Sequence, residues 1–307
     1  HSRRLPLRRT WTVTLGGAPL SVAAGAWTND TITVVVPAGA STGQLEVRRA
    51  PAAPGAMGRK SEHGITVIVG TDPNRVHAVA PGGSIQATID NPLTRPGDVV
   101  LVPPGTYYEM LVITKPVQLQ GWGASSTIIN AVQSPTERLS EWRNKVNYLA
   151  NCSHELGLLT GQANNVANAA APCGHTPGTG LLATNEGPGI LVAPRVGVFN
   201  GAPARIDGLT ITGADQSAGI LVNGNARFLE ISNNVVANNQ GSHAAGIRVG
   251  HPSLLGANNE IIDCNNDDVA IHHNLVTQNG GLAGTEPGAG IGLYSGSTDY
   301  RVTSNYV

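Results

Sequence analysis

Aromatic and charged residues are scarce in this chain of 307 residues. Phe, Trp and Tyr together make up 4% of the sequence, so a core must be built mainly from Val, Ile, Leu and Ala. Charged residues make up 13%, and the net charge of −1 argues against a general nucleic-acid binder. No apolar run approaches the roughly 20 residues that a helix needs to span a membrane.

A secretion signal is also missing from the start of the sequence. Residues His1 to Thr10 contain four arginines, but no apolar segment follows them, as it does in a signal peptide. We therefore expect a trimmed or processed beginning, with a functional basic arm as the alternative.

Glycine and proline are abundant, and short motifs recur. The 39 Gly and 20 Pro make up about a fifth of the chain, against a usual share of about 12%. One motif is repeated three times, as Ile231-x-x-Asn234-x-Val236, Ile271-x-x-Asn274-x-Val276 and Val302-x-x-Asn305-x-Val307. A second, Gly-Ile followed by two further residues, begins at Gly189, Gly219, Gly246 and Gly290. The spacing is uneven, which indicates a coil with loops of variable length.

Each motif is typical of a short strand that ends in a turn. Ile231 and Ile271 are expected to point into one interior, and Ser232 and His272 away from it. A single strand of this kind cannot bury its apolar side by itself, so successive copies must stack into a continuous core. Asn tolerates the left-handed conformation, and stacked Asn amides bond to one another, so we expect the repeated Asn to be structural. The predicted fold class is all-β, with a parallel coil of stacked strands.

The first 70 residues are expected to form a separate small β unit. Alternating segments begin at Trp11 and Gly43, and the series Trp27, Ile32, Pro37 lies between them. The stretch from Trp27 to Val47 resembles the immunoglobulin-like IPT/TIG family. The family's first strand is not recognisable here. The resemblance implies an Ig-like β-sandwich that serves as a spacer or binding module of surface proteins.

Residues 71–307 are assigned to the coil. The run from Val76 to Ala131, with Pro103-Pro104-Gly105 at a turn, resembles the opening of right-handed parallel β-helix proteins of the pectate-lyase-like class. Such openings occur in lyases, epimerases and adhesins, so the resemblance implies the fold alone. A short helix from Ser84 to Asp90 is expected to cover the end of the coil. Because the sequence stops within a repeat at Val307, we expect the coil to continue beyond it or to be covered by a partner.

The segment 133–187 interrupts the repeats. Ser134-Pro135 followed by Glu137 predicts a helix with a capping box. Apolar residues at helical spacing, Leu139, Trp142, Val146 and Leu149, are expected to line one of its faces.

Two of the three cysteines follow this helix. Cys152 and Cys173 are predicted to form a disulfide that closes the insertion, with two unpaired thiols as the alternative. A disulfide implies an oxidising location: extracellular, cell-surface or periplasmic. The remaining Cys264 is either buried or paired outside the chain.

The coil and its helix-bearing insertion also resemble β-helix segments of large exported bacterial proteins. Some of those are labelled multicopper-oxidase-like because of other parts of the chain. The copper motifs of that family are not found here, so no residue of this sequence is assigned a copper role.

Oxygen donors recur in the segment after Ile262. Asp263, Asn265 and Asp267 occupy positions 1, 3 and 5 of a calcium loop, but Asp268 stands where that loop requires Gly, and Asn274 where it requires Glu. A looser calcium site and a polar turn remain the two interpretations, and calcium is the cofactor that the first of them implies.

Four histidines are candidate metal ligands. His272 and His273 are adjacent, so in a strand they would face opposite sides and fail to chelate one ion. With His243 and His251 they remain candidates for a zinc or copper site on one face, against surface histidines as the alternative.

Arg248 is the candidate catalytic base. It lies between Ile247 and Val249 and should project outward from a strand, with Asp215, Arg205 and Arg227 on nearby turns. Polysaccharide lyases of this fold use an outward Arg or Lys as base beside calcium-bound carboxylates, so the resemblance implies that Arg248 acts with an acidic neighbour such as Asp215 or Asp263. No compact run of carboxylates on adjacent strands accompanies Arg248 in the sequence.

Two functions from different classes follow. The favoured one is an exported or cell-surface structural and binding module, which holds a polysaccharide or a neighbouring protein along the outer face of the coil. The alternative is a carbohydrate-active enzyme of the lyase or epimerase type. A third interpretation is an accessory segment of a larger multicopper-oxidase-like protein.

Overall fold

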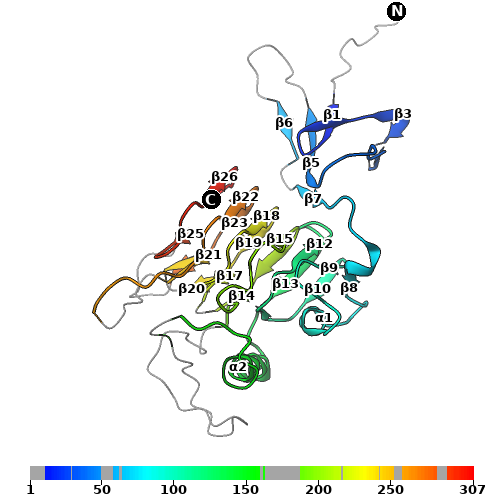
Figure 1. The fold of residues 1–307 in the computed structure, drawn as a ribbon. Helices are drawn as coiled ribbons and strands as arrows, with labels where there is room; N and C mark the ends of the chain where they lie inside the picture. The colour runs from blue at the N-terminus through cyan, green and yellow to red at the C-terminus, as the bar shows by residue number, and fades with distance from the viewer. Residues whose placement is uncertain are drawn as a thin grey trace, which may run out of the picture. The chain divides into compact units, whose positions relative to one another are not determined.

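The structure is a computed structural model that describes residues 11–28, 30–49, 58–61, 64–159, 162, 187–215, 217–241, 243–251, 258–281 and 289–307. The chain divides into two compact units, His1–Asp72 and Pro73–Val307 (Figure 1). Both units are built mainly from strands.

The first unit is antiparallel. Its main sheet has the order β2-β1-β5-β6, with β7 also paired to β5, and a second sheet pairs β3 with β4. The strands are β1 (Trp11–Leu15), β2 (Ala18–Leu20), β3 (Val22–Trp27), β4 (Ile32–Val34), β5 (Gly43–Arg49), β6 (Arg59–Lys60) and β7 (Ile65–Val67). Val13, Leu15 and Leu20 form its small buried core.

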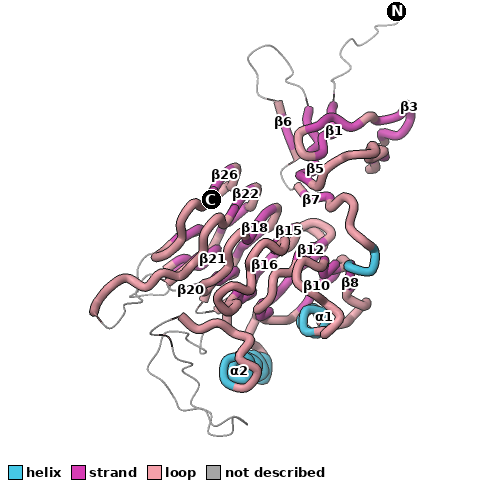
Figure 2. The backbone as a smooth tube through the Cα atoms, viewed as in Figure 1, coloured by secondary structure: helices cyan, strands magenta, loops and turns pink. Residues whose placement is uncertain are grey.

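The second unit contains three parallel sheets, named here in the order in which the chain reaches them (Figures 1 and 2). Sheet 1 contains β8 (Val76–Ala78), β9 (Val99–Val102), β12 (Gln118–Gly121), β15 (Ala204–Asp207), β18 (Leu229–Ser232), β22 (Ala270–His272) and β26 (Arg301–Thr303). Sheet 2 contains β10 (Gly105–Tyr107), β13 (Thr127–Asn130), β16 (Thr210–Thr212), β19 (Val235–Ala237) and β23 (Leu275–Thr277). Sheet 3 contains β11 (Leu111–Ile113), β14 (Ile190–Val192), β17 (Ile220–Val222), β21 (Ala244–Val249) and β25 (Ala289–Leu293).

The chain visits these sheets in rotation. From β9 onward, successive strands enter sheets 1, 2 and 3, and each strand pairs in parallel with its counterpart from the previous turn. A small pair, β20 (Gln240–Gly241) with β24 (Gly280–Gly281), joins sheets 2 and 3 in later turns. The prediction of stacked parallel strands is therefore confirmed.

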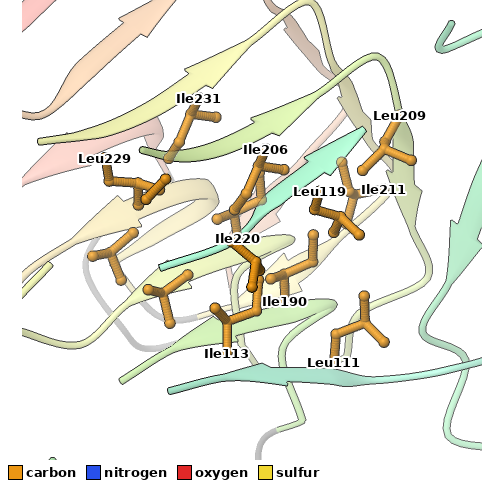
Figure 3. Packing of buried hydrophobic residues seen from close by; sticks show 14 of the residues in the cluster. Leu111, Ile113, Leu119, Ile190, Ile206, Leu209, Ile211, Ile220, Leu229 and Ile231 are labelled. Carbon is orange, nitrogen blue, oxygen red and sulfur yellow. The ribbon is translucent and has the colours of Figure 1, made fainter. Parts of the chain in front are cut away.

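The interior of the coil is one continuous apolar core. Ile and Leu side chains from all three sheets converge in it, as Leu119, Ile206 and Ile231 do from sheet 1 (Figure 3). Ile231 and Ile271 are fully buried, as their motif predicts. Burying an Ile or Leu side chain contributes roughly 1.5–3 kcal/mol, so this column is the main stabilising element of the unit.

The repeated asparagines form a ladder along the coil. The backbone N–H and the side-chain amide of Asn234 both donate to Oδ1 of Asn274, and those of Asn274 donate to Asn305. The structural role predicted for them is confirmed. The left-handed conformation, however, belongs to the preceding residue: Asn233, His273 and Ser304 have φ of 57°, 56° and 55°. The residue before each ladder asparagine makes the turn of the backbone, and the asparagine makes the hydrogen bonds to the next copy of the motif.

Two helices cover parts of the coil. Helix α1 (Ile85–Asp90) has Ser84 as its N-cap and buries Ile85 and Ile89 in the core, close to the predicted bounds. A single turn of 3-10 helix, Pro73–Arg75, precedes β8.

Helix α2 (Thr136–Asn151) lies between β13 and β14 in sequence. Trp142, Val146 and Leu149 are buried against Leu191 and Leu221 on the outer face of sheet 3, and Leu139 packs beside them. The apolar face is thus confirmed. The predicted capping box is wrong, because the N-cap is Pro135 and no side chain caps the helix.

Cys173 lies outside the described residues, so the Cys152–Cys173 disulfide and the closure of the insertion stay predictions. Cys264 is a buried free cysteine, and burial raises the pKa of its thiol. In the described ranges no helix is long and apolar enough to cross a membrane.

Candidate functional site

The predicted base Arg248 lies in the middle of β21. Its neighbours Ile247 and Val249 belong to the core, and it pairs in register with Leu221 and Gly292, so it faces the outer side of sheet 3. Arg248 is only 6% exposed, however. A catalytic arginine on an open sheet surface was expected, and the residue is instead covered.

Two further polar side chains lie beside Arg248. The ring of Tyr294 approaches the α-carbon of Gly292, since a Cβ built there would lie 2.8 Å from it. The ring of His243, just before β21, meets that of Tyr294 edge to face at 6.0 Å. Sequence reasoning missed Tyr294, because an aromatic residue after a strand carries no catalytic signal by itself.

Asp215 lies in the turn that leads from β16 into β17, and its side chain is exposed. It therefore belongs to the turn of coil before Arg248. The other two predicted arginines lie elsewhere. Arg205 is on sheet 1, where it pairs with Glu230, and Arg227 precedes β18 and pairs with Asp267 at 3.3 Å.

The three calcium candidates serve the turn before β22. Oδ1 of Asp263 accepts a bond of 2.7 Å from the backbone N–H of Asn265. The amide of Asn265 donates to Oδ1 of Asn225, and Asp267 accepts from Thr298 as well as from Arg227. Within the ranges that the structure covers, no group of three or more His, Cys, Asp or Glu side chains is placed to hold a metal ion.

The prediction that His272 and His273 face opposite sides is wrong. The left-handed backbone of His273 ends β22 and turns the second ring toward the first. Their Nδ1 atoms lie 2.9 Å apart and the rings are perpendicular. His243 and His251 flank β21 in sheet 3, whereas this pair ends a strand of sheet 1, so the four histidines do not share one face.

The histidine pair belongs to a polar network on the outer face of sheet 1. Arg205 donates from Nε to Oε2 of Glu230 at 2.7 Å, and Oε1 of Glu230 lies 2.9 Å from Nε2 of His272. Burial alone would raise the pKa of Glu230, but the hydrogen bond with His272 and the charge of Arg205 outweigh it and lower this pKa to about 2. The carboxylate is therefore ionised across the physiological range.

A second polar group lies beside this network. Asp207 is fully buried, and its oxygens accept bonds from Gln120, Ser232 and Asn233 at 2.8, 2.6 and 2.7 Å. A buried carboxylate requires such donors. These polar residues of sheet 1 bond mainly to one another, which makes them structural.

A surface cleft of about 730 Å³ lies at the first turn of the coil. Three elements line it: the segment that leads into α1, the strand β10 with the residues after it, and the first half of α2. The lining side chains include Gln86, Tyr107, Tyr108, Glu109, Arg138, Glu141, Trp142 and Lys145. Its size lies within the range of about 300–1,000 Å³ that is typical of ligand pockets.

Hydrogen bonds hold the walls of the cleft in place. The hydroxyl of Tyr107 donates to the carbonyl of Pro103 at 3.0 Å, and burial followed by the charge of Glu109 raises the pKa of this phenol. Glu109 accepts bonds from the backbone N–H groups of Ile85 and Gln86 and from the Ser84 hydroxyl. The guanidinium of Arg138 lies over the ring of Tyr108, at 4.9 Å from its centroid.

Sequence reasoning missed the cleft, although it identified parts of each wall. Pro103-Pro104-Gly105 was interpreted only as a turn, and Trp142 only as part of a helix face. Nothing in the sequence indicates that α2 packs near β10, because that contact depends on the path of the insertion.

Comparisons of the chain with protein families, with curated proteins and with solved structures find no match.

Proposed function

We propose that this chain is an exported or cell-surface structural and binding module, located extracellularly or in the periplasm, that holds a polysaccharide or a neighbouring protein. The three-sheet coil would act as a rigid rod, and the cleft at its first turn as the binding site. The observation that carries the proposal is the lining of that cleft, where Tyr108, Trp142 and Arg138 come together. Aromatic and Arg side chains are the types enriched at binding hot spots.

The finer description of the fold belongs to the same proposal. Parallel strands joined by crossovers are right-handed in about 98% of cases, so we assign the coil as a right-handed parallel β-helix of the pectate-lyase-like class. The antiparallel pairing of β1 with β5 and the packing of Trp27 near the core of the first unit favour the Ig-like, IPT/TIG-like assignment.

The polar face of sheet 1 favours binding over catalysis. Glu230 and Arg205 form an ion pair, and Asp207 is fully buried among amide and hydroxyl donors. Because these groups bond to one another, we assign them to stabilising the coil. The cleft is then the better candidate for contact with a partner.

The experiment is a paired assay of binding and turnover on the purified chain. Co-sedimentation with insoluble neutral and acidic polysaccharides, and capture by envelope proteins on a biosensor surface, should reveal retention without chemical change. Tyr108→Ala should reduce the retention, whereas Tyr148→Ala, an exposed tyrosine of α2 outside the cleft, should not. New absorbance from an unsaturated product of a polyuronate would overturn the proposal.

The second candidate is a carbohydrate-active enzyme of the lyase or epimerase type. The observation that favours it is the grouping of Arg248, Tyr294 and His243 on the outer side of sheet 3. During proton abstraction an arginine can stabilise the developing negative charge, and a tyrosine can transfer a proton.

This candidate is tested by substituting Arg248 and Asp215 separately. Arg248→Lys should lower turnover of a polyuronate strongly, and Tyr294→Phe should lower it as well. Asp215→Asn should lower turnover if Arg248 acts with Asp215, which lies on the preceding turn of the coil. It should leave turnover unchanged if Arg248 acts with Tyr294 and His243. Unchanged activity of the Arg248 variant would remove this residue from any mechanism.

A further inference from the structure

The three sheets of the coil end differently at their first turn. Sheet 1 is extended by β8, which pairs with β9. Sheet 3 ends at β11, where the side-chain amide of Gln86 donates to the carbonyl of Val112 at 3.0 Å and accepts from its N–H at 2.7 Å. Gln86 thus makes the two bonds that a further strand would make. Sheet 2 ends at β10, which has β13 on one side and no described strand on the other.

The free edge of β10 faces the cleft. The backbone N–H of Gly105 donates to the carbonyl of Ser126, so Gly105 directs its polar groups toward β13. These directions alternate along a strand, so the N–H and C=O of Thr106 point to the opposite, open edge. Thr106 is exposed and lines the cleft with Gly105 and Tyr107. An open edge of this kind is a template for strand addition.

Two carboxylates, Glu109 and Glu141, and two cations, Arg138 and Lys145, are among the described residues that line the cleft. Glu109 accepts from the backbone N–H groups at the start of α1, and Lys145 is ion-paired with Asp90. Arg138 donates to the carbonyl of Ser134 at 2.6 Å and stacks on Tyr108. No carboxylate forms an ion pair with Arg138 among the residues that the structure covers. Its remaining donors suit a carboxylate, which an Arg fork binds with two bonds.

A buried donor lies in the same wall. Trp142 lines the cleft at 4% exposure, and its indole N–H has no acceptor in the described part of the chain. Buried donors are nearly always paired, so the acceptor of this N–H is expected outside the described residues.

We propose that the cleft binds an extended acidic peptide segment of a partner protein, which adds to β10 as a further strand of sheet 2. The N–H and C=O of Thr106 pair with the peptide backbone, and Arg138 binds an acidic side chain of the peptide. A peptide fits better than a sugar because the strand edge presents a backbone donor and acceptor in the spacing that another backbone complements. This inference rests on the proposed binding function and names the class of partner.

The test starts from a displayed library of random seven-residue peptides, selected on the full chain. Enriched peptides should carry Asp or Glu at one fixed position and lack Pro within the paired segment. A synthetic copy of the strongest binder is then N-methylated at each backbone amide in turn. Strand addition predicts that one position, whose N–H donates to the carbonyl of Thr106, loses about three- to tenfold in affinity and that the two positions beside it lose little.

Two pairs of variants test the site itself. Thr106→Pro removes the outward N–H without breaking a bond to β13, so the coil should keep its melting temperature while peptide affinity falls about three- to tenfold. Thr106→Ala retains the N–H and should bind as the wild type does. Arg138→Gln should lose about tenfold or more for the acidic peptide, whereas Arg195→Gln, an exposed arginine outside the cleft, should lose nothing.

The outcomes separate this inference from the broader proposal. Loss of affinity at a single N-methylated position together with weak binding by Thr106→Pro supports strand addition. Failure to enrich any peptide, or binding that neither Thr106→Pro nor Arg138→Gln weakens, overturns it. In either of those cases, retention of a polysaccharide that Tyr108→Ala reduces would leave the proposed binding function standing with a different ligand.

Discussion

Glu230 and His272 lie on adjacent strands of sheet 1, and Oε1 of the glutamate is 2.9 Å from Nε2 of the histidine. The other oxygen of Glu230 accepts from Arg205. One carboxylate therefore joins three successive turns of the coil, through β15, β18 and β22. The contribution of this network to the free energy of unfolding can be measured by substitution.

Glu230→Gln should weaken the second unit by about 1–3 kcal/mol at pH 7, because it removes the charge that Arg205 and His272 both bind. The measurement is the free energy of unfolding in urea. Glu155→Gln, at an exposed position, is the matched control and should change it by less than about 0.5 kcal/mol. Equal effects of the two substitutions would show that the ion pair contributes nothing measurable.

Lowering the pH should remove the stabilisation that the ionised Glu230 contributes to the second unit. The pKa of Glu230 is lowered from 4.5 to about 2, so its stabilising effect is present above about pH 4.5 and is lost as the pH falls toward 2. The shift sets an upper limit of roughly 3 kcal/mol. Urea unfolding between pH 2 and 7 should show a steeper loss for the wild type than for Glu230→Gln. Asp98, whose pKa is also lowered, acts on both proteins and cancels in the comparison. Parallel curves would contradict the assignment.

Trp142→Ala should detach helix α2 from the outer face of sheet 3. Trp142 is 4% exposed and packs in the cluster with Val146 and Leu191, so the cost should be about 3–5 kcal/mol. Tyr148→Ala on the same helix, at 55% exposure, should cost much less. Urea unfolding measures the loss, and proteolysis within 136–151 should accelerate only in the Trp142 variant. A small effect in both would mean that the helix packs weakly.

Asn274→Ala should break the asparagine ladder in the middle. Its side chain bonds to Asn234, Asn305 and the carbonyl of Ile231, and both Asn234 and Asn274 are buried. Loss of these bonds leaves buried groups unpaired, which should cost about 2–4 kcal/mol by thermal or urea unfolding. Asn200→Ala, at an exposed turn, provides the baseline. If both variants unfold alike, the ladder has no energetic role.

The fold was largely predictable because its signal is repeated. Ile231 and Ile271 occupy the same place in successive turns, so a pattern of a few residues specified the stacking, and Asn234 and Asn274 specified the ladder. The start of α2 was predicted less well, since Ser134 caps nothing. Capping depends on local backbone angles that a motif only approximates.

The site was much harder to predict. Arg248 faces outward as expected, but it is buried, which the alternation of its strand does not indicate. The two adjacent histidines meet because one residue, His273, leaves the strand conformation. The cleft joins Thr106 to Trp142, which no sequence period relates. Features that arise within one repeat are legible in the sequence, whereas features that arise between an insertion and the coil are not.

The insertion between β13 and β14 leaves the coil and returns to it without a change in strand register. β13 pairs with β10 and β16, and β14 pairs with β11 and β17, in unbroken register on either side of the departure. A segment inserted at this corner therefore need not change the winding around it, but removal of α2 would expose the apolar outer face of sheet 3 at Leu191 and Leu221. A foreign segment grafted at the same corner would have to supply an apolar face of its own.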